Sequence, residues 1–332
     1  EKGESIVFAA STTECKPRSL KTLFQKEADE RTPRDNFIHC LTNAAHQFHV
    51  HNKAGERYIL AGYPWFKCRA RDTFIALPGL TLAIDEVDYF EDAMKTAVRQ
   101  LRQFMEGKEQ DGMITEMEQP DVPLWAIWAV QQYAKKIGMK LAAQKFGKLI
   151  YDIMSFISSG KHPNLRLDER GLLSTEGKKK AVTWMNSTVN GHPVVPRTGY
   201  IVEFNALWYN ALLFAAAIAD ELNAPDDAQK LRASSEVTKK SFVETFVNEY
   251  GYRWRYTQLE CASKYDFRRG FRLFPTYSCA AEEHCGFLHA RALDSKGTAL
   301  TVTQEYRLQP YVCWTSITAR LCLSPGHCLA MA

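Results

Sequence analysis

Charged and tryptophan side chains stand close together in three stretches of this sequence. In the first, Trp65 precedes Arg71 and Asp72, which lie at the expected start of a helix. The guanidinium and the carboxylate offer donors and acceptors for sugar hydroxyls, and the indole offers a flat apolar wall. The structural alternative is that Asp72 caps the helix and Arg71 pairs with a neighbouring carboxylate.

The second stretch places Asp121 two residues before Pro123 and four before Trp125. An acidic residue just ahead of a helix with proline in its first turn is an ordinary N-cap arrangement. Capping is therefore the simpler interpretation of Asp121 taken by itself.

The third stretch contains Trp184 and Asn186, followed by Arg197 and Glu203. Glu203 begins an expected helix whose next turns are wholly apolar, and a buried acid is costly unless it is paired or functional. Two interpretations stay open, a structural pair with Arg197 and a role in a site.

The elements that must position these residues are helices. Apolar residues recur at helical spacing in six segments, separated by polar, glycine and proline clusters: Phe37–Val50, Phe90–Met105, Leu124–Ile137, Ala142–Ile157, Phe204–Leu222 and Ala228–Phe246. The clearest alternating strand pattern is Ser5–Ala10. Two segments, Leu124–Val130 and Ala206–Ala219, are apolar nearly all round, which is typical of helices buried on both sides. They suit either the inner ring of a two-layer helical toroid or a packed bundle.

Composition excludes several classes of protein. With 45% apolar residues the chain can bury a sizeable core, and because it has no run of about 18 apolar residues we expect no membrane span. The first 252 residues are electrically neutral and offer no basic face for nucleic acid, whereas residues 253–332 hold ten Lys/Arg and six Asp/Glu. The body has neither a phosphate-binding loop nor zinc-ligand spacing, so no metal is expected. The start, without methionine or a signal-peptide core, is expected to be cut from a longer chain.

In order and spacing, these segments resemble the glucosidase domain of bacterial-type glycogen debranching enzymes, the amylo-α-1,6-glucosidase family. The matching strings are GYPWF…RDTFIALPGL (62–80), DGMI…DVPLW (111–125), TWMN (183–186) and VVPRTGYIVEFNALWYNAL (194–212). Residues 1–19 look like the end of an upstream β-sandwich domain and a linker. The resemblance covers residues 1–252 almost continuously.

The resemblance implies an all-α fold, an (α/α)6 toroid over residues 20–252, incomplete at its C-terminal end. It also implies hydrolysis of α-1,6-linked glucose at debranched stubs of glycogen, starch or a branched α-glucan oligosaccharide. The mechanism is inverting, with one carboxylic acid and one carboxylate roughly 6.5–9.5 Å apart. The resemblance implies no cofactor and no membrane or nucleic-acid partner. The expected process is glycogen catabolism and the expected location is the cytoplasm, and the oligomeric state stays open.

Carried over residue by residue, the resemblance assigns substrate binding to residues from all three stretches: Trp65, Arg71, Asp72, Asp121, Trp125, Trp184 and Arg197. Asn186 occupies the position of the family's general acid. An amide cannot deliver a proton as a carboxylic acid can, so Glu203 is the nearest remaining candidate. Two further departures are Arg69 and Ala70, where the family usually has Trp and Gly, and Arg69 places a charge where an aromatic residue is expected. The general base is not present in the in-frame part of this chain, because the loop region that would supply it in the family follows residue 252.

Residues 253–332 are expected to be translated out of frame. Codons for Arg320–Ala332, read one nucleotide downstream, permit DYAYHQGT(A/V)WPW, which resembles a family signature. The same shift turns Ser263–Arg269 and Leu293–Gly297 into family-like strings in the expected order. Such a tail should be irregular and weakly packed, with few helices, because it was never selected for consistent local signals. The alternative is a genuine cysteine-rich tail that folds or binds zinc.

Three functions therefore stay open for this chain. The first is a glycoside hydrolase of the amylo-α-1,6-glucosidase type, present here as an inactive or weakly active fragment. The second is a carbohydrate-binding protein without catalysis, and the third is a related toroid glycosidase of trehalase or glucoamylase type.

Overall fold

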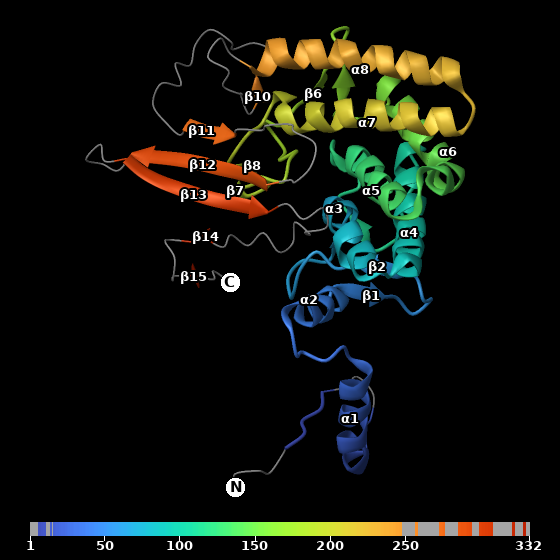
Figure 1. Cartoon of the computed structure of the whole chain (residues 1–332), viewed down its shortest axis with the longest axis vertical. Coiled ribbons are helices and arrows are strands. Elements are labelled where there is room, and N and C mark those ends of the chain that lie inside the picture. Colours follow the sequence, from blue (N-terminus) through green and yellow to red (C-terminus); the bar gives the residue numbers. More distant parts are fainter. Residues whose placement is uncertain are drawn as a thin grey trace. The chain divides into compact units, whose positions relative to one another are not determined.

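The structure is a computed structural model (Figure 1), which describes residues 6–10, 14 and 16–247, and after these only strand segments. The chain forms two compact units, Glu1–His49 and Val50–Ala332. Eight α-helices lie in the described residues, and the strands before Val247 are each two or three residues long. The fold is therefore mostly helical with little sheet, and this confirms the predicted all-α class.

The first unit contains a short 3-10 helix, η1 (Pro17–Ser19), and two α-helices, α1 (Leu20–Glu30) and α2 (Phe37–His46). Asn36 caps α2, because its side-chain oxygen accepts a hydrogen bond of 2.9 Å from the backbone N–H of His39.

Two expectations for this unit are wrong. The helix predicted to reach Val50 ends at His46. The backbone N–H groups of Gln47 and Phe48 donate to the carbonyls of Ala44 and Ala45, only three residues earlier, and this tightens the last turn. The strand predicted over Ser5–Ala10 is absent from described residues 6–10. Alternation alone makes no strand, since a strand also needs a hydrogen-bonded neighbour.

Three helical hairpins make up the helical part of the second unit (Figure 1). The first hairpin pairs α3 (Ala70–Thr81) with α4 (Val87–Met105), and the short 3-10 helix η2 (Leu82–Ile84) connects them. The second pairs α5 (Val122–Ile137) with α6 (Met139–Ser158), and the third pairs α7 (Val202–Glu221) with α8 (Pro225–Phe246). The first helix of each pair contacts the first helix of the next, α3 with α5 and α5 with α7. Inner helices packed side by side, each backed by an outer helix, agree with the predicted toroid-type glycosidase fold.

The burial pattern explains which helix is inner. In α3, ten of twelve residues are buried, and α5 is likewise buried on most sides. In contrast, α4 buries mainly small and apolar residues on one face and exposes charged ones on the other. A helix with a wide apolar face therefore lies in the inner layer, and a helix with a narrow apolar face lies in the outer layer.

Gly138 makes the tight connection between α5 and α6 possible. Its φ of 109° is a backbone conformation that other residues rarely adopt, and its N–H closes α5 by donating to Ala134 O at 2.8 Å. The next helix begins at once with Met139.

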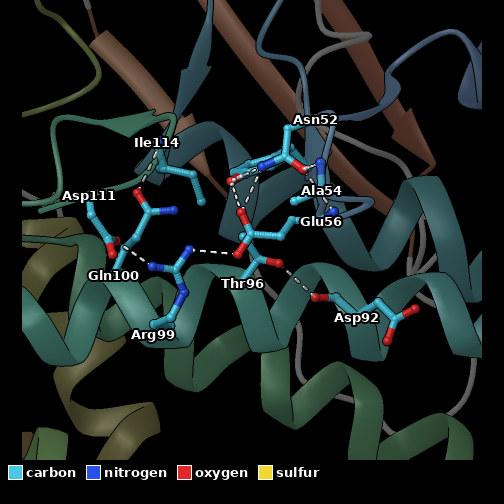
Figure 2. Close-up of polar contacts among 10 residues, drawn as sticks. Asn52, Ala54, Glu56, Asp92, Thr96, Arg99, Gln100, Asp111 and Ile114 are labelled. Atoms are coloured by element: carbon cyan, nitrogen blue, oxygen red, sulfur yellow. Dashed lines mark hydrogen bonds and ion pairs between the residues drawn. The ribbon is translucent and has the colours of Figure 1, made fainter.

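A polar network fixes α4 to the segment that precedes the hairpins (Figure 2). That segment contains β1 (His49–His51) and β2 (Arg57–Ile59). Glu56, in the turn between them, accepts hydrogen bonds from Asn52 at 2.7 Å, Tyr58 at 2.8 Å and Arg99 of α4 at 2.8 Å. The hydrogen bond from Tyr58 is the largest of the effects that hold the pKa of Glu56 below its usual value.

The remaining short strands lie in the loops between helices. They are β3 (Cys68–Arg69), β4 (Ile114–Thr115), β5 (Arg166–Leu167), β6 (Leu173–Thr175), β7 (Thr188–Val189), β8 (His192–Pro193) and β9 (Gly199–Ile201). β3 and β4 pair in parallel, and β5, β6 and β9 belong to one sheet that also includes β10 (Tyr256–Thr257).

Helix α7 is long and apolar enough to cross a membrane by length and composition alone, the one such helix among the described residues. In the fold it contacts α5, α6 and α8, and 56% of its apolar window is buried. Its first turn carries Asn205, which is fully buried and hydrogen-bonded to the backbone of Leu173. These contacts are typical of the core helix of a globular domain.

After Val247 only strand segments are described. They are β10, β11 (Arg272–Pro275), β12 (Cys285–Leu293), β13 (Ala299–Arg307), β14 (Leu321–Cys322) and β15 (Cys328–Leu329). No helix occurs in these segments, but β12 and β13 form a regular antiparallel ladder nine residues long, where irregular structure was expected. Threonine and valine recur along β13, and such residues favour strands. The expected cysteine and zinc alternatives involve side chains outside the described residues.

Candidate functional site

Arg71 and Asp121 form a buried ion pair between α3 and the residue before α5. The Arg71 Nε lies 2.7 Å from Asp121 Oδ2 and Nη2 lies 2.8 Å from Oδ1, so the contact has two parallel hydrogen bonds. The two side chains are only 8% and 4% exposed. Burial lowers the pKa of Arg71, but the charge and hydrogen bonds of Asp121 outweigh it and raise that pKa overall. The pair therefore fixes the two helix starts against each other.

The capping role expected for Asp121 is wrong. Asp121 is the residue before α5, yet its side chain makes no capping hydrogen bond and its backbone is in a helical conformation. Its carboxylate instead accepts from Arg71 and, at 3.1 Å, from the indole Nε1 of Trp125 one turn later. Capping of α3 by Asp72 is also absent, because the residue before that helix is Arg69 and no side chain caps it.

The strands β3 and β4 explain why these distant residues meet. Cys68 and Arg69 pair in parallel with Ile114 and Thr115, which brings the loop before α3 beside the loop before α5. Arg69 forms an ion pair with Glu116 at 3.4 Å and lies over the ring of Phe66, 4.6 Å from its centre. The charge that departs from the family pattern is thus held between an acid and an aromatic face.

Asp72 lies in the first turn of α3, next to the pair, and is partly buried. Burial raises the pKa of its carboxyl, and the charges of Arg71 and Arg69 offset only part of that rise. Among the described residues, no hydrogen bond or ion pair joins its side chain to another residue, although its own backbone N–H donates to the carboxyl. A carboxyl without a partner residue, beside a fixed guanidinium, is suited to accept hydroxyls of a ligand.

Arg197 and Glu203 form the second ion pair, at the start of α7. Arg197 Nη2 lies 2.8 Å from Glu203 Oε2, and a second contact joins Nη1 to Oε1. The Arg197 side chain is 3% exposed and that of Glu203 is 28% exposed. Of the two interpretations left open for Glu203, structural pairing is therefore observed. With both oxygens engaged, proton transfer by Glu203 would first require this pair to open.

The segment 177–184 lies beside both ion pairs. Arg71 Nη2 donates to the carbonyl of Val182 at 3.3 Å. At the other end of the segment, a Cβ added at Gly177 would stand 1.9 Å from the carbonyl oxygen of Arg197 and 3.0 Å from Val182 Cγ2. Glycine is required there because the two backbones approach so closely.

Three of the expected site residues are exposed. Trp65 is 81% exposed in the loop before β3, Trp184 is 50% exposed, and Asn186 is exposed just before β7. The structure thus joins Arg71, Asp121 and Trp125 directly, with Asp72 beside them, and joins Arg197 with Glu203. Convergence of all these residues on one concave surface stays a prediction.

Several partners of these residues carry no pattern in the sequence that would indicate their role. Gln119 Oε1 lies 3.4 Å from Arg71 Nη2, and the Val182 contact is made by a carbonyl group that every residue type carries.

His162 is fully buried, and burial lowers its pKa to about 4. Its Nδ1 accepts from the backbone N–H of Asn164 at 3.0 Å, which leaves the proton on Nε2.

The comparison with known protein families fits this fold and these loops. The chain matches the family model for amylo-alpha-1,6-glucosidase over residues 43–324, and it belongs to that family. No curated protein matches the chain. The matched range continues beyond residue 252, where the resemblance was expected to stop. The domain boundaries at residues 19 and 252, and out-of-frame translation after the second, stay predictions.

Proposed function

We propose that this chain recognises and hydrolyses terminal α-1,6-linked glucose at stubs of glycogen, starch or branched α-glucan oligosaccharides. One observation carries the proposal: in a chain of the amylo-alpha-1,6-glucosidase family, the buried Arg71–Asp121 pair stands beside the Asp72 carboxyl, which no other described residue pairs with. Breakdown of a storage glucan in the cytoplasm, without a cofactor, is the setting that this activity suggests.

The proposed binding roles follow from the geometry. Asp121 holds the Arg71 guanidinium in place, and Asp72 offers two oxygens to sugar hydroxyls. Trp65 and Trp184 present exposed indole faces, and such faces suit the apolar side of a sugar ring. Arg197 supports the start of α7 through Glu203 and acts on the ligand only indirectly.

The proposed mechanism is inverting hydrolysis, which needs an acid on the leaving oxygen and a base for water. Position 186 carries an amide, so the proton donor is weakened, and the family's base belongs to the region after residue 252, which we expect to be out of frame in this chain. We therefore expect ligand binding with slow glucose release, and faster release when Asn186→Asp restores a carboxylic acid.

A second candidate function is carbohydrate binding without catalysis. The specific observation in its favour is Asn186, which cannot act as the family acid. A trehalase-like or glucoamylase-like specificity is the third alternative, and substrate profiling separates it.

The test is glucose release and binding with panose, trehalose and maltose as parallel substrates. Our proposal expects panose to bind best and to yield glucose slowly, with an increase in rate for Asn186→Asp. Binding without any glucose release in both proteins would favour the second function. Preference for trehalose or maltose would favour the third.

A further inference from the structure

Arg69 is the residue that directly precedes α3, and Asp72 is the third residue of that helix. Side chains at these two positions lie on the same side of a helix start. Burial raises the pKa of Asp72, and the positive charges of Arg71 and Arg69 offset part of that rise, so Arg69 acts on this carboxyl. A hydrogen-bond donor and a hydrogen-bond acceptor therefore lie side by side at the start of α3.

The Arg69 guanidinium is held on two sides. Its Nε lies 3.4 Å from Glu116 Oε1, and its Cζ lies 4.6 Å from the centre of the Phe66 ring. Phe66 is itself fixed, because its backbone N–H donates to the carbonyl of Gly62 at 3.1 Å. A side chain that is already held in this way loses little conformational freedom when it binds a ligand.

Glu116 reaches Arg69 from a backbone conformation that glutamate rarely adopts. Its φ is 61°, in the left-handed region, and its carbonyl accepts a hydrogen bond from the N–H of Gln119 at 3.3 Å. Such a conformation costs free energy and persists only where the surrounding structure imposes it. Here the turn that follows β4 holds the Glu116 carboxylate against Arg69.

Arg69 still has donors to offer a ligand. Its side chain is 29% exposed, and among the described residues no hydrogen bond engages its Nη1 and Nη2 groups. A guanidinium carries several N–H donors in one plane, so the contact of Nε with Glu116 leaves the terminal groups available.

The charges around this point favour an uncharged ligand. The guanidiniums of Arg69 and Arg71 stand among three carboxyl groups, those of Asp72, Glu116 and Asp121. Negative charge therefore exceeds positive charge when the carboxyls are ionised, which disfavours a phosphate group. A sugar hydroxyl both donates and accepts, and so suits a donor and an acceptor placed side by side.

We propose that Arg69 is a substrate-recognition residue, which donates to one hydroxyl of the terminal glucose while Asp72 accepts from the adjacent hydroxyl of the same ring. The inference rests on the proposed glucan substrate and names the part of it that is recognised, a pair of neighbouring hydroxyls. Glu116 is a positioning residue that acts through Arg69. A site built to bind a hydroxyl rejects an analogue that lacks it, because the protein group is then left unpaired.

The experiment measures by calorimetry the binding of methyl α-isomaltoside and of its derivatives that lack the 2-, 3- or 4-hydroxyl of the terminal glucose. The full chain is compared with Arg69→Met, Glu116→Gln and Asp72→Asn. Arg57→Met is the matched control, because Arg57 of β2 has the same surroundings outside the proposed site: Asp92 at 3.4 Å and the ring of Tyr89 at 4.9 Å.

We expect Arg69→Met to bind the isomaltoside about tenfold more weakly, and to become insensitive to the loss of one hydroxyl to which wild type is sensitive. Glu116→Gln should weaken binding about threefold, because the guanidinium is no longer held, and Arg57→Met should bind as wild type does.

Wild-type affinity in Arg69→Met overturns the proposal, and so do competition by inorganic phosphate and equal losses for every deoxy derivative in wild type and Arg69→Met. If Arg69→Met does not fold, Glu116→Gln decides, and wild-type affinity in that variant counts against Arg69. Weak binding in Asp72→Asn alone refutes the role of Arg69 and leaves the proposed function intact. No binding of the isomaltoside by wild type overturns both.

Discussion

Replacing Asp121 with leucine would leave the Arg71 guanidinium buried without its charge partner. The side chains of the pair are 8% and 4% exposed, so water cannot replace the lost carboxylate without a change in structure. The remaining acceptors are distant, Gln119 Oε1 at 3.4 Å and Val182 O at 3.3 Å. Removing one partner of a buried pair costs about 3–5 kcal/mol. Trp125 also loses its acceptor, which adds about 1 kcal/mol.

The assay is a double-mutant cycle by denaturant unfolding with Asp121→Leu, Arg71→Met and the double variant. Each single variant leaves one buried group unpaired, whereas the double variant removes both charges. We therefore expect the double variant to lose much less stability than the sum of the two singles. In a domain of this size, a loss of 3 kcal/mol corresponds to a fall in Tm of about 6–12 °C.

Lys239→Ala is the matched control, because Lys239 and Glu236 form an exposed ion pair at 3.6 Å on α8. Such a pair contributes about 0–1 kcal/mol. If Asp121→Leu costs no more than this control, or if the losses in the double variant simply add, the Arg71–Asp121 pair does not hold the two helix starts together.

Three further predictions concern other groups. His162 has a pKa of about 4 in the folded protein and 6.5 in the unfolded chain. Between pH 4 and pH 6.5 the unfolded chain therefore binds a proton that the folded protein does not, and the stability of the fold decreases as the pH drops from 6.5 to 4. His162→Gln should remove about 3 kcal/mol of this pH dependence, measured as the difference between the unfolding curves of the two proteins. Asp72→Asn should raise the free energy of unfolding at pH 7, because the raised pKa of Asp72 means that its ionised form destabilises the fold above pH 3.8. The same variant should lose its affinity for panose. Gly177→Ala should lower Tm and weaken panose binding, because its Cβ would collide with the Arg197 carbonyl oxygen; normal stability and binding would contradict the close approach.

Much of the helical framework could be predicted because helical periodicity is a local signal. The segment Leu124–Ile137 became α5 with its C-terminus at the predicted residue, and Phe90–Met105 lies inside α4. Each helix begins earlier than predicted, α5 at Val122 and α4 at Val87. The strand expected at Ser5–Ala10 did not form, because a strand depends on a hydrogen-bonded partner elsewhere in the chain.

The site was predictable only where partners are close in sequence. Arg197 and Glu203 are six residues apart, and their pairing was one of two interpretations. Asp121 looked like a cap because its actual partner, Arg71, is fifty residues earlier. Tertiary contact overrode the local preference. The Val182 carbonyl and the buried ring of His162 carry no pattern that would reveal their positions beforehand.

The central claim is that the site around Asp72 recognises a terminal α-1,6-linked glucose. The most direct measurement is the affinity of the full chain for panose, compared between wild type and Asp72→Asn by calorimetry, with trehalose as the reference sugar. Our account predicts that wild type binds panose more tightly than trehalose, and that Asp72→Asn loses about tenfold or more in affinity while remaining folded. Equal panose affinity in the two proteins, or no panose binding by wild type, would contradict it.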